Sequence, residues 1–243
     1  MSTPFTIVRL LPQILGLNGS LASGEIVAVS LRHMGHDVHI LDVDTPEDVP
    51  ATADLVCVGS GSTSSISPGA KALSALMPSL HAWKNQGTSW IAHGVGWDLL
   101  GVDVLTAQGD HLPGVGIFPS RADHRFPRFS GEVSGVDYRG RPSAGYLNAV
   151  GQSELNESVQ PLMRLEHPRG AEPVHEGLRA DNLLATRVGG PALALNPHWA
   201  GDIVEELLAK RGLEPDFGPF HERVELLATQ ARAKIVARLG AKN

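Results

Sequence analysis

Three glycine-bearing turns follow predicted strands, and they are the places where this sequence could support chemistry. They are Gly59-Ser60-Gly61, Gly94-Val95-Gly96 and Gly189-Gly190. At the carboxyl edge of a parallel sheet, the backbone N–H groups of such turns can face an anion or an oxyanion. Glycine also has a purely structural use in turns, because it adopts a positive φ at little cost. From the residues alone, both interpretations stay open.

The first turn opens a loop rich in hydroxyl groups, which could in principle hold a nucleophile. Its members are Ser60, Ser62, Thr63, Ser64 and Ser65. No G-x-S-x-G elbow surrounds them, and spacing assigns them no His or Asp partner. The same loop has neither G-x-G-x-x-G nor GK[ST], the patterns that cradle phosphates, so nucleotide binding is not predicted.

The histidines and tryptophans near the turns have ordinary structural interpretations. We expect His93 to point away from residue 94 and to pack, and His198 to lie partly exposed in the first turn of a helix. Trp97 and Trp199 are expected in the core or at an interface. None of the 11 histidines shows H-E-x-x-H or another metal-ligand spacing, so neither a metal nor another cofactor is predicted.

The elements that would position these turns alternate along the first 93 residues. Apolar runs predict strands, and three-to-four spacing predicts helices. The predicted order is strand 5–11, helix 21–35, strand 37–44, strand 54–61, helix 68–85 and strand 88–93. Such alternation favours a parallel sheet between helices, with ligands bound at the carboxyl ends of the strands.

The chain changes character after Gly101. Short apolar runs separated by Gly, Pro, Asn and Asp over residues 112–185 predict mainly antiparallel strands. Helices follow at 196–212 and 220–239. In the last helix, one apolar side is predicted to dock on the core; it is formed by Val224, Leu227, Ala231, Ile235 and Leu239.

Composition limits the class of protein. The chain has 243 residues, 42% of them hydrophobic and 19% charged, which is typical of one globular α/β unit. A net charge of -6 and an aromatic share of 5% argue against a nucleic-acid partner. No segment has the apolar length of a spanning helix or the form of a signal peptide. The single cysteine, Cys57, cannot form an internal disulfide, so we expect a cytoplasmic protein.

The order of these features resembles a known family. "LLPQILGLNGSLASGEIVAVSLRHMGHDVHILDVD", "ADLVCVGSGST", "SWIAHGVGWDLLG", "SAGYLNAVGQSE" and "ATRVGGPALALNPHWA" follow the motif order of class I glutamine amidotransferase-like domains of the cobyric acid synthase type. The resemblance is strongest to the glutaminase subunits of lipid II isoglutaminyl synthases, which partner a Mur-ligase-like subunit. It covers most of residues 5–210. It implies a flavodoxin-like three-layer α/β sandwich with a mostly parallel central sheet and an added antiparallel region.

Two positions depart from the family pattern. In the family, a cysteine at the elbow Ala-Ile-Cys-Gly-Gly-Tyr-Gln-Leu-Leu-Gly attacks glutamine, and a histidine before Gly-Pro moves the proton. Aligned on those motifs, the cysteine falls on Gly94 and the histidine on Gly189. Glycine has no functional group, so the resemblance implies that glutaminase chemistry is lost. Cys57 lies inside the preceding strand and is predicted to be a small buried residue, not a substitute.

The resemblance also implies domain limits and a pocket. Residues 1–212 would form the amidotransferase-like domain, and residues 213–243 a helical extension packed on it. The predicted ligand pocket consists of Gly59, Ser60, Gly61, Gly94, Val95, Asn148, Gly189 and Gly190.

Three functions remain open at this point. The first is a non-catalytic or regulatory partner of a ligase or synthetase, such as a Mur-ligase-like subunit. The second is an enzyme that is active only in a partnered complex with a repurposed pocket. The third is a module that binds glutamine or another small metabolite.

Overall fold

The central layer is a six-stranded sheet. The computed structural model describes residues 3–167 and 174–241. The sheet order is β13-β14-β4-β3-β1-β2, in which only the edge strand β13 is antiparallel to its neighbour. These strands are β1 (Phe5–Leu10), β2 (Val38–Val43), β3 (Leu55–Val58), β4 (Ser89–His93), β13 (Leu178–Ala180) and β14 (Leu183–Thr186). The five parallel strands are β1, β2, β3, β4 and β14. When they are numbered 1 to 5 along the chain, their order in the sheet is 2-1-3-4-5.

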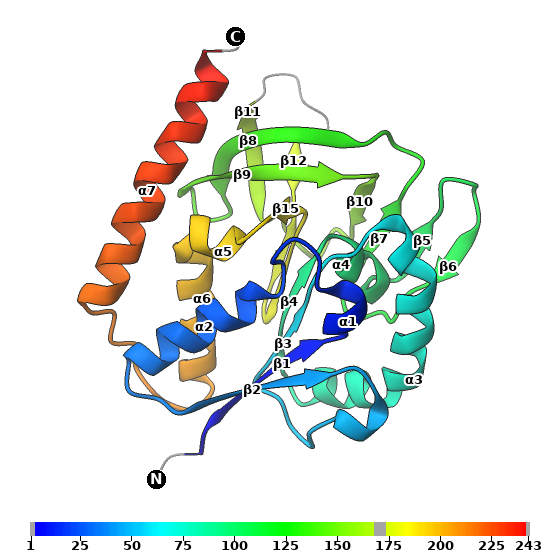
Figure 1. Ribbon diagram of the computed structural model, residues 1–243, viewed down its shortest axis with the longest axis horizontal. Coiled ribbons are helices and arrows are strands. Elements are labelled where there is room, and N and C mark those ends of the chain that lie inside the picture. The colour runs from blue at the N-terminus through cyan, green and yellow to red at the C-terminus, as the bar shows by residue number, and fades with distance from the viewer. Residues whose placement is uncertain (1–2, 168–173, 242–243) are drawn as a thin grey trace.

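Helices cover both faces of this sheet (Figure 1). Helices α2 (Ala22–His33) and α6 (Pro197–Ala209) share a core with Ile7 and Leu55, whereas α3 (Ile66–Asn85) and α4 (Gly94–Leu100) share the opposite core. The neighbouring residues Val8 and Val56 point into that second core because side chains alternate along a strand. Strands buried on both faces explain the continuous apolar runs. The helices predicted at 21–35, 68–85 and 196–212 are present with ends shifted by a few residues.

Short helical turns connect the layers. They are α1 (Pro12–Leu15), the 3₁₀ turns η1 (Pro46–Asp48) and η2 (Thr63–Ser65), and α5 (Ala192–Leu195).

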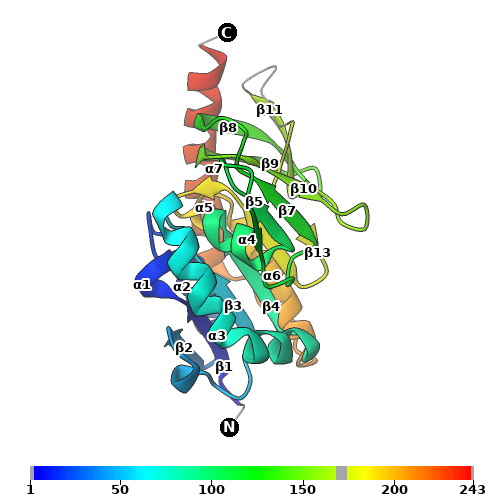
Figure 2. The same ribbon diagram turned by 90° about the vertical axis from the view of Figure 1, so that its right-hand side faces the viewer.

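Strands of the region after Gly101 form two further sheets. One is antiparallel, in the order β12-β11-β8-β9-β15, and the other has the order β10-β7-β5-β6. Their members are β5 (Asp103–Leu105), β6 (His111–Pro113), β7 (Ser120–Asp123), β8 (Phe129–Asp137), β9 (Pro142–Ala149), β10 (Gln152–Leu155), β11 (Met163–His167), β12 (His175–Glu176) and β15 (Val188–Gly189). Both views place β8 and β9 at one end of the central sheet (Figures 1 and 2).

The predicted antiparallel region needs two corrections. It begins with β5, at Asp103, instead of at residue 112, and β14, at the end of the predicted region, pairs in parallel with β4 in the central sheet. Strands as short as β5 carry too few residues to show a period in the sequence. Part of the predicted region, residues 168–173, lies outside the described residues.

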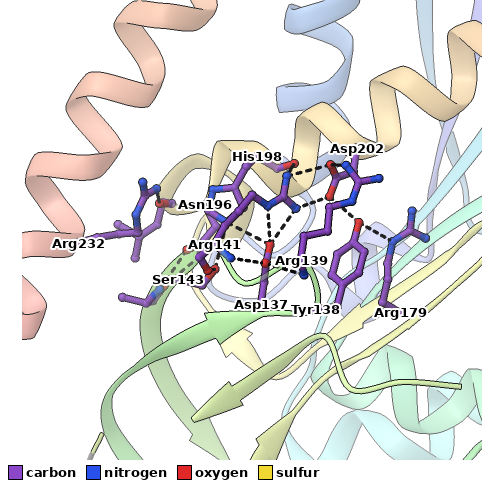
Figure 3. A network of polar contacts seen from close by, with 12 residues as sticks. Asp137, Tyr138, Arg139, Arg141, Ser143, Arg179, Asn196, His198, Asp202 and Arg232 are labelled. Carbon is purple, nitrogen blue, oxygen red and sulfur yellow. Dashed lines mark hydrogen bonds and ion pairs between the residues drawn. The ribbon is translucent and has the colours of Figure 1, made fainter. Parts of the chain in front are cut away.

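A buried carboxylate fastens the β8–β9 hairpin to α6 (Figure 3). Asp202 accepts hydrogen bonds from the Tyr138 hydroxyl at 2.5 Å, from Arg139 at 2.8 Å and from Arg141 at 2.5 and 3.0 Å. Charge-assisted bonds of this kind offset the desolvation of the carboxylate. Asp202 and these three partners, the Asp202 cluster, join the hairpin to α6.

His198 lies beside the Asp202 cluster. Its side chain is only 11% exposed, and its Nε2 lies 3.0 Å from the Ser143 hydroxyl. The residue as a whole is half-buried, in agreement with the prediction, and its imidazole is the more covered part because it contacts Ser143 of β9.

The last helix, α7 (Pro219–Gly240), packs along β8, β9 and α5 by a side that shares Ile235 and Leu239 with the predicted one but not Leu227 and Ala231. Its buried residues are Ala228, Arg232, Ile235 and Leu239. Leu227 is 50% exposed, and Ala231 is exposed as well. Arg232 takes the inward position because its guanidinium donates to the Leu195 carbonyl, at 2.8 Å, and to Glu225.

Within residues 3–167 and 174–241, no helix combines the length and apolarity needed to cross a membrane. The division of the chain at residue 212 stays a prediction.

Candidate functional site

The predicted strand-to-helix turn is present at Gly94. Strand β4 ends at His93, and α4 begins at the next residue. Gly94 is buried and has a φ of +46°, in the left-handed region that L side chains rarely adopt. A sharp turn of this type, between a buried strand and a helix, is the geometry that presents a nucleophile in hydrolases. The backbone of an elbow is thus in place, with no side chain at its apex.

The Ser60 side chain fills the space beside this apex. A Cβ built on Gly94 would overlap the Ser60 hydroxyl oxygen and would lie 3.1 Å from the Ser60 Cβ. The Val95 backbone N–H, the first donor after the apex, points to the same Ser60 Oγ at 3.3 Å.

The loop that carries Ser60 is held by the segment after α1. The Ser60 N–H donates to Ser20 Oγ at 2.8 Å, and the Leu17 N–H donates to the Ser60 carbonyl at 2.9 Å. The Ser20 hydroxyl in turn donates to the Leu17 carbonyl at 2.7 Å. Because both backbone groups of Ser60 are bonded, its Cβ has a fixed position relative to Gly94.

A cavity of about 730 Å³ opens beside the elbow, within the usual range of small-molecule sites. Seven of the eight predicted pocket residues line it: Ser60, Gly61, Gly94, Val95, Asn148, Gly189 and Gly190. Gly59 does not. It is buried under the loop, where a Cβ would overlap the Leu15 carbonyl oxygen, so its absent side chain serves a close backbone approach. Residues far apart in the sequence therefore meet at the carboxyl edge of the sheet.

Gly189 lines the cavity from a different element, strand β15, which pairs with β9. It is exposed, its φ is not positive, and the nearest atom to an added Cβ is the Tyr146 carbonyl oxygen at 3.4 Å. That distance is ordinary van der Waals contact. A Cβ at residue 189 would fit without rearrangement.

His93 is buried, as the sequence predicts, but it also lines the cavity together with Gly94. It is 2% exposed, and its Nε2 lies 2.8 Å from the Ser23 hydroxyl. Burial lowers its pKa to about 4, so the imidazole is neutral at physiological pH. Cys57 is 1% exposed, and burial raises the pKa of its thiol, which leaves it a poor nucleophile. Trp97 and Trp199 are buried, as predicted.

Asp98 and His124 form a polar cluster on the cavity wall that sequence reasoning missed. Asp98, on α4, accepts from His124 Nε2 at 2.9 Å and from Arg187 at 2.6 Å. All three line the cavity, and the Arg187 guanidinium also lies 5.3 Å from the centre of the Trp97 ring. The one signal in the sequence was Asp98 itself, a carboxylate in an otherwise apolar helix. Among the described residues, no three His, Cys, Asp or Glu side chains are arranged to hold a metal ion.

A scan against models of protein families gives no match. Among curated proteins, the chain is 22% identical over 210 residues to the GatD subunit of the glutamine-hydrolyzing lipid II isoglutaminyl synthase of Staphylococcus aureus. The match covers 85% of this chain and 86% of that protein.

Solved structures of glutamine amidotransferases share the architecture. One matches with a TM-score of 0.53 and 15% identity, covering 82% of this chain and 98% of its own. Another, from Thermotoga maritima, matches with a TM-score of 0.50 and 10% identity over 98% of this chain and 99% of its own. The chain has a glutamine amidotransferase-like fold.

In this glutamine amidotransferase-like fold, the cavity lies where doubly wound sheets bind their ligands, at the carboxyl ends of the parallel strands. The elbow contributes the inner wall. The β8–β9 hairpin, fastened by Asp202, contributes Tyr146 and Asn148 to the outer wall. The Asn148 side-chain oxygen accepts from Arg128 at 2.8 Å, which orders two polar groups at the mouth.

Proposed function

We propose that this chain is a glutamine amidotransferase-like subunit that lacks the glutaminase nucleophile and base and acts as a non-catalytic or regulatory partner of a ligase or synthetase. Gly94 would stand at the nucleophile position and Gly189 at the base position. The partner would be Mur-ligase-like, and the pair would work in the cytoplasm. The strand order 2-1-3-4-5 supports a flavodoxin-like classification of the domain.

The observation that carries this proposal is the filled apex of the elbow. An elbow that presents a nucleophile needs room for its side chain, and here the Ser60 hydroxyl takes that room. The backbone donor beside the apex, the Val95 N–H, is already bonded to Ser60. Removing one member of a nucleophile–base unit costs most of the nucleophilic rate, and both positions carry glycine here.

The partner is proposed from the similarity to GatD, which is named as a subunit of a synthase. The similarity extends over 85% of this chain. A domain that keeps the fold of a subunit without its chemistry retains a use as an assembly partner.

Ammonia release from glutamine tests the loss of chemistry. We expect the purified protein, alone and with a co-expressed ligase subunit, to release no ammonia above a glutamine-only blank. The Cys57→Ala variant is the matched control, because Cys57 is the single thiol. Activity that persists in Cys57→Ala would contradict the proposal and favour an enzyme that recruits other residues in a partnered complex.

Size-exclusion chromatography after co-expression with a candidate ligase subunit tests the partnership. We expect the two chains to elute together at the mass of a heteromer. Separate elution of two folded chains would remove the proposed partner while leaving the loss of chemistry untouched.

The open cavity favours a second candidate function, a module that binds glutamine or a related metabolite. About 730 Å³ remains available although the apex is filled. A rise in the melting temperature with glutamine, reduced in Asn148→Ala, would support this function; no shift at millimolar glutamine would argue against it. Free ligand raises apparent stability by mass action, so the shift should grow with concentration.

A further inference from the structure

The elbow and the serine loop meet through one side chain. Ser60 is partly buried and belongs to the wall of the cavity, and its hydroxyl oxygen is the atom that a Cβ on residue 94 would overlap. The same oxygen accepts the Val95 N–H at 3.3 Å. In elbows that present a nucleophile, the N–H of the following residue is a donor to the oxyanion. The Ser60 hydroxyl thus takes the space of a side chain at residue 94 and also accepts the hydrogen bond of the Val95 N–H.

The position of Ser60 is imposed by its backbone. Its N–H is bonded to Ser20, its carbonyl oxygen is bonded to Leu17, and the two segments form an isolated β-bridge. The Ser60 Cβ therefore cannot withdraw from Gly94 unless the 17–20 segment moves. Rotation about χ1 could move the hydroxyl alone, but this would break its bond with Val95 and leave the Cβ 3.1 Å from the added Cβ.

We propose that Ser60 is the closing residue of the elbow: its side chain excludes a nucleophile at residue 94 and occupies the backbone donor that would otherwise face an oxyanion. The inference rests on the proposed loss of glutaminase chemistry and goes beyond it, because it assigns the closure to one residue outside the two glycine positions. It also predicts that closure is reversible by substitution at Ser60.

Ser60 has no partner to activate it as a nucleophile within the described residues. Its hydroxyl hydrogen can point to the Gly61 carbonyl oxygen at 3.4 Å, which is a weak acceptor geometry and not a base. The neutral imidazole of His93 is bonded to Ser23 through Nε2, and its Nδ1 makes no hydrogen bond to Ser60. His124 is bonded to Asp98. A closing function uses the observed contacts, whereas a nucleophilic function would need a base that these contacts do not supply.

A double-mutant cycle measures the closure. We expect Gly94→Ala to raise the unfolding equilibrium constant more in the Ser60 protein than in the Ser60→Gly protein, with a difference of about tenfold between the two backgrounds. Urea denaturation of the four proteins gives the four constants. Gly190→Ala is the matched control, because Gly190 also has a positive φ, +69°, but no atom lies within 4 Å of an added Cβ. Its cost should be the same in both backgrounds.

Thiol labelling provides a second readout that does not depend on the size of a stability change. We expect the thiol introduced by Gly94→Cys to react with iodoacetamide about tenfold faster when Ser60→Gly is also present, because it then has room in the open cavity. The wild-type protein, whose single thiol is buried, should remain unlabelled in the native state. If Gly94→Cys does not fold, the Gly94→Ala cycle still decides the question.

The outcomes separate this inference from the proposed function. Additive costs at residues 60 and 94, or equal labelling rates in both backgrounds, would overturn the closing function while the protein still released no ammonia from glutamine. Ammonia release by the wild type that is lost in Ser60→Ala would overturn both, since Ser60 would then be a nucleophile. Non-additive costs together with an inactive wild type support both.

Discussion

The two glycine positions on the cavity wall differ in how much the surrounding structure depends on them. Gly94 is buried, has a left-handed φ of +46° and leaves no room for a Cβ. Gly189 is exposed, has no positive φ and has only the Tyr146 carbonyl oxygen near, at 3.4 Å. The Gly94 side of the cavity is therefore closed by packing, whereas the Gly189 side is open. Under the proposed function, recovering glutaminase chemistry would need more than two substitutions.

The largest expected effect concerns the support of the Gly189 side. Asp202→Ala removes a buried acceptor from Tyr138, Arg139 and Arg141, although Arg141 keeps its bond to Asp137 at 2.8 Å. We expect a loss of about 3 kcal/mol in the free energy of unfolding, typical of a broken buried ion pair. Urea denaturation measures it. Asp202→Asn keeps the shape and should cost less; equal stability of Asp202→Ala and wild type would show that the hairpin does not depend on the Asp202 cluster.

Gly94→Cys tests the closed side. The left-handed φ costs a side chain about 1–2 kcal/mol, and overlap with Ser60 adds a cost of about 1 kcal/mol. We expect a total loss of about 2–3 kcal/mol, again from urea denaturation. A Gly94→Cys variant as stable as the wild type would mean that the elbow is as permissive as β15, and the contrast between the two positions would disappear.

The buried histidine before the elbow predicts a pH dependence. Burial lowers the pKa of His93, and of His198, to about 4 from an ordinary value of 6.5. The unfolded chain then binds protons that the folded chain does not between pH 6.5 and pH 4, so stability is fully present above that window and is lost as the pH falls through it. Each histidine contributes a slope of about 1.4 kcal/mol per pH unit.

Glu176 changes the stability with pH in the opposite direction to the histidines. The contribution of His93 must therefore be measured with a variant. Burial raises its pKa to about 7 from 4.5, so its contribution is present at low pH and is lost as the pH rises through that range. Comparing His93→Gln with wild type removes this background. We expect the variant to lose less stability than the wild type between about pH 6.5 and pH 5. Identical profiles would show that His93 does not titrate as described.

The smallest effect is expected at the open position. Gly189→His should change the free energy of unfolding by no more than about 0.5 kcal/mol, as for exposed residues without special contacts. Thermal unfolding of this variant beside Gly94→Cys makes the comparison in one experiment. A cost at residue 189 equal to that at residue 94 would show that both positions are under the same packing constraint.

Much of the sheet and of the elbow was predictable because local patterns determine them. Buried runs such as "DLVCVG" identify parallel strands, and the glycine turns after them mark the cavity edge, so seven of the eight predicted pocket residues line it. Gly59 does not line this cavity, because glycine serves close packing as readily as ligand access.

Other features depend on contacts that no local pattern contains. The Asp98–Arg187 pair joins residues 89 positions apart, and the helix α7 buries Arg232 where periodicity favours Leu227, because a carbonyl oxygen of α5 lies within reach of the guanidinium. The filled apex of the elbow also depends on contacts between residues that are distant in the sequence. It depends on the side-chain rotamer of Ser60 and on how the 17–20 segment holds its backbone.

Intact-mass spectrometry after treatment with a diazo-ketone analogue of glutamine tests the central claim most directly, because this reagent alkylates the nucleophile of a glutaminase site. A cysteine-bearing glutamine amidotransferase treated in parallel serves as the positive control. We predict that the wild-type protein keeps its unmodified mass, with or without a ligase partner. A stoichiometric adduct that glutamine prevents, mapped to any residue of the cavity, would contradict the account.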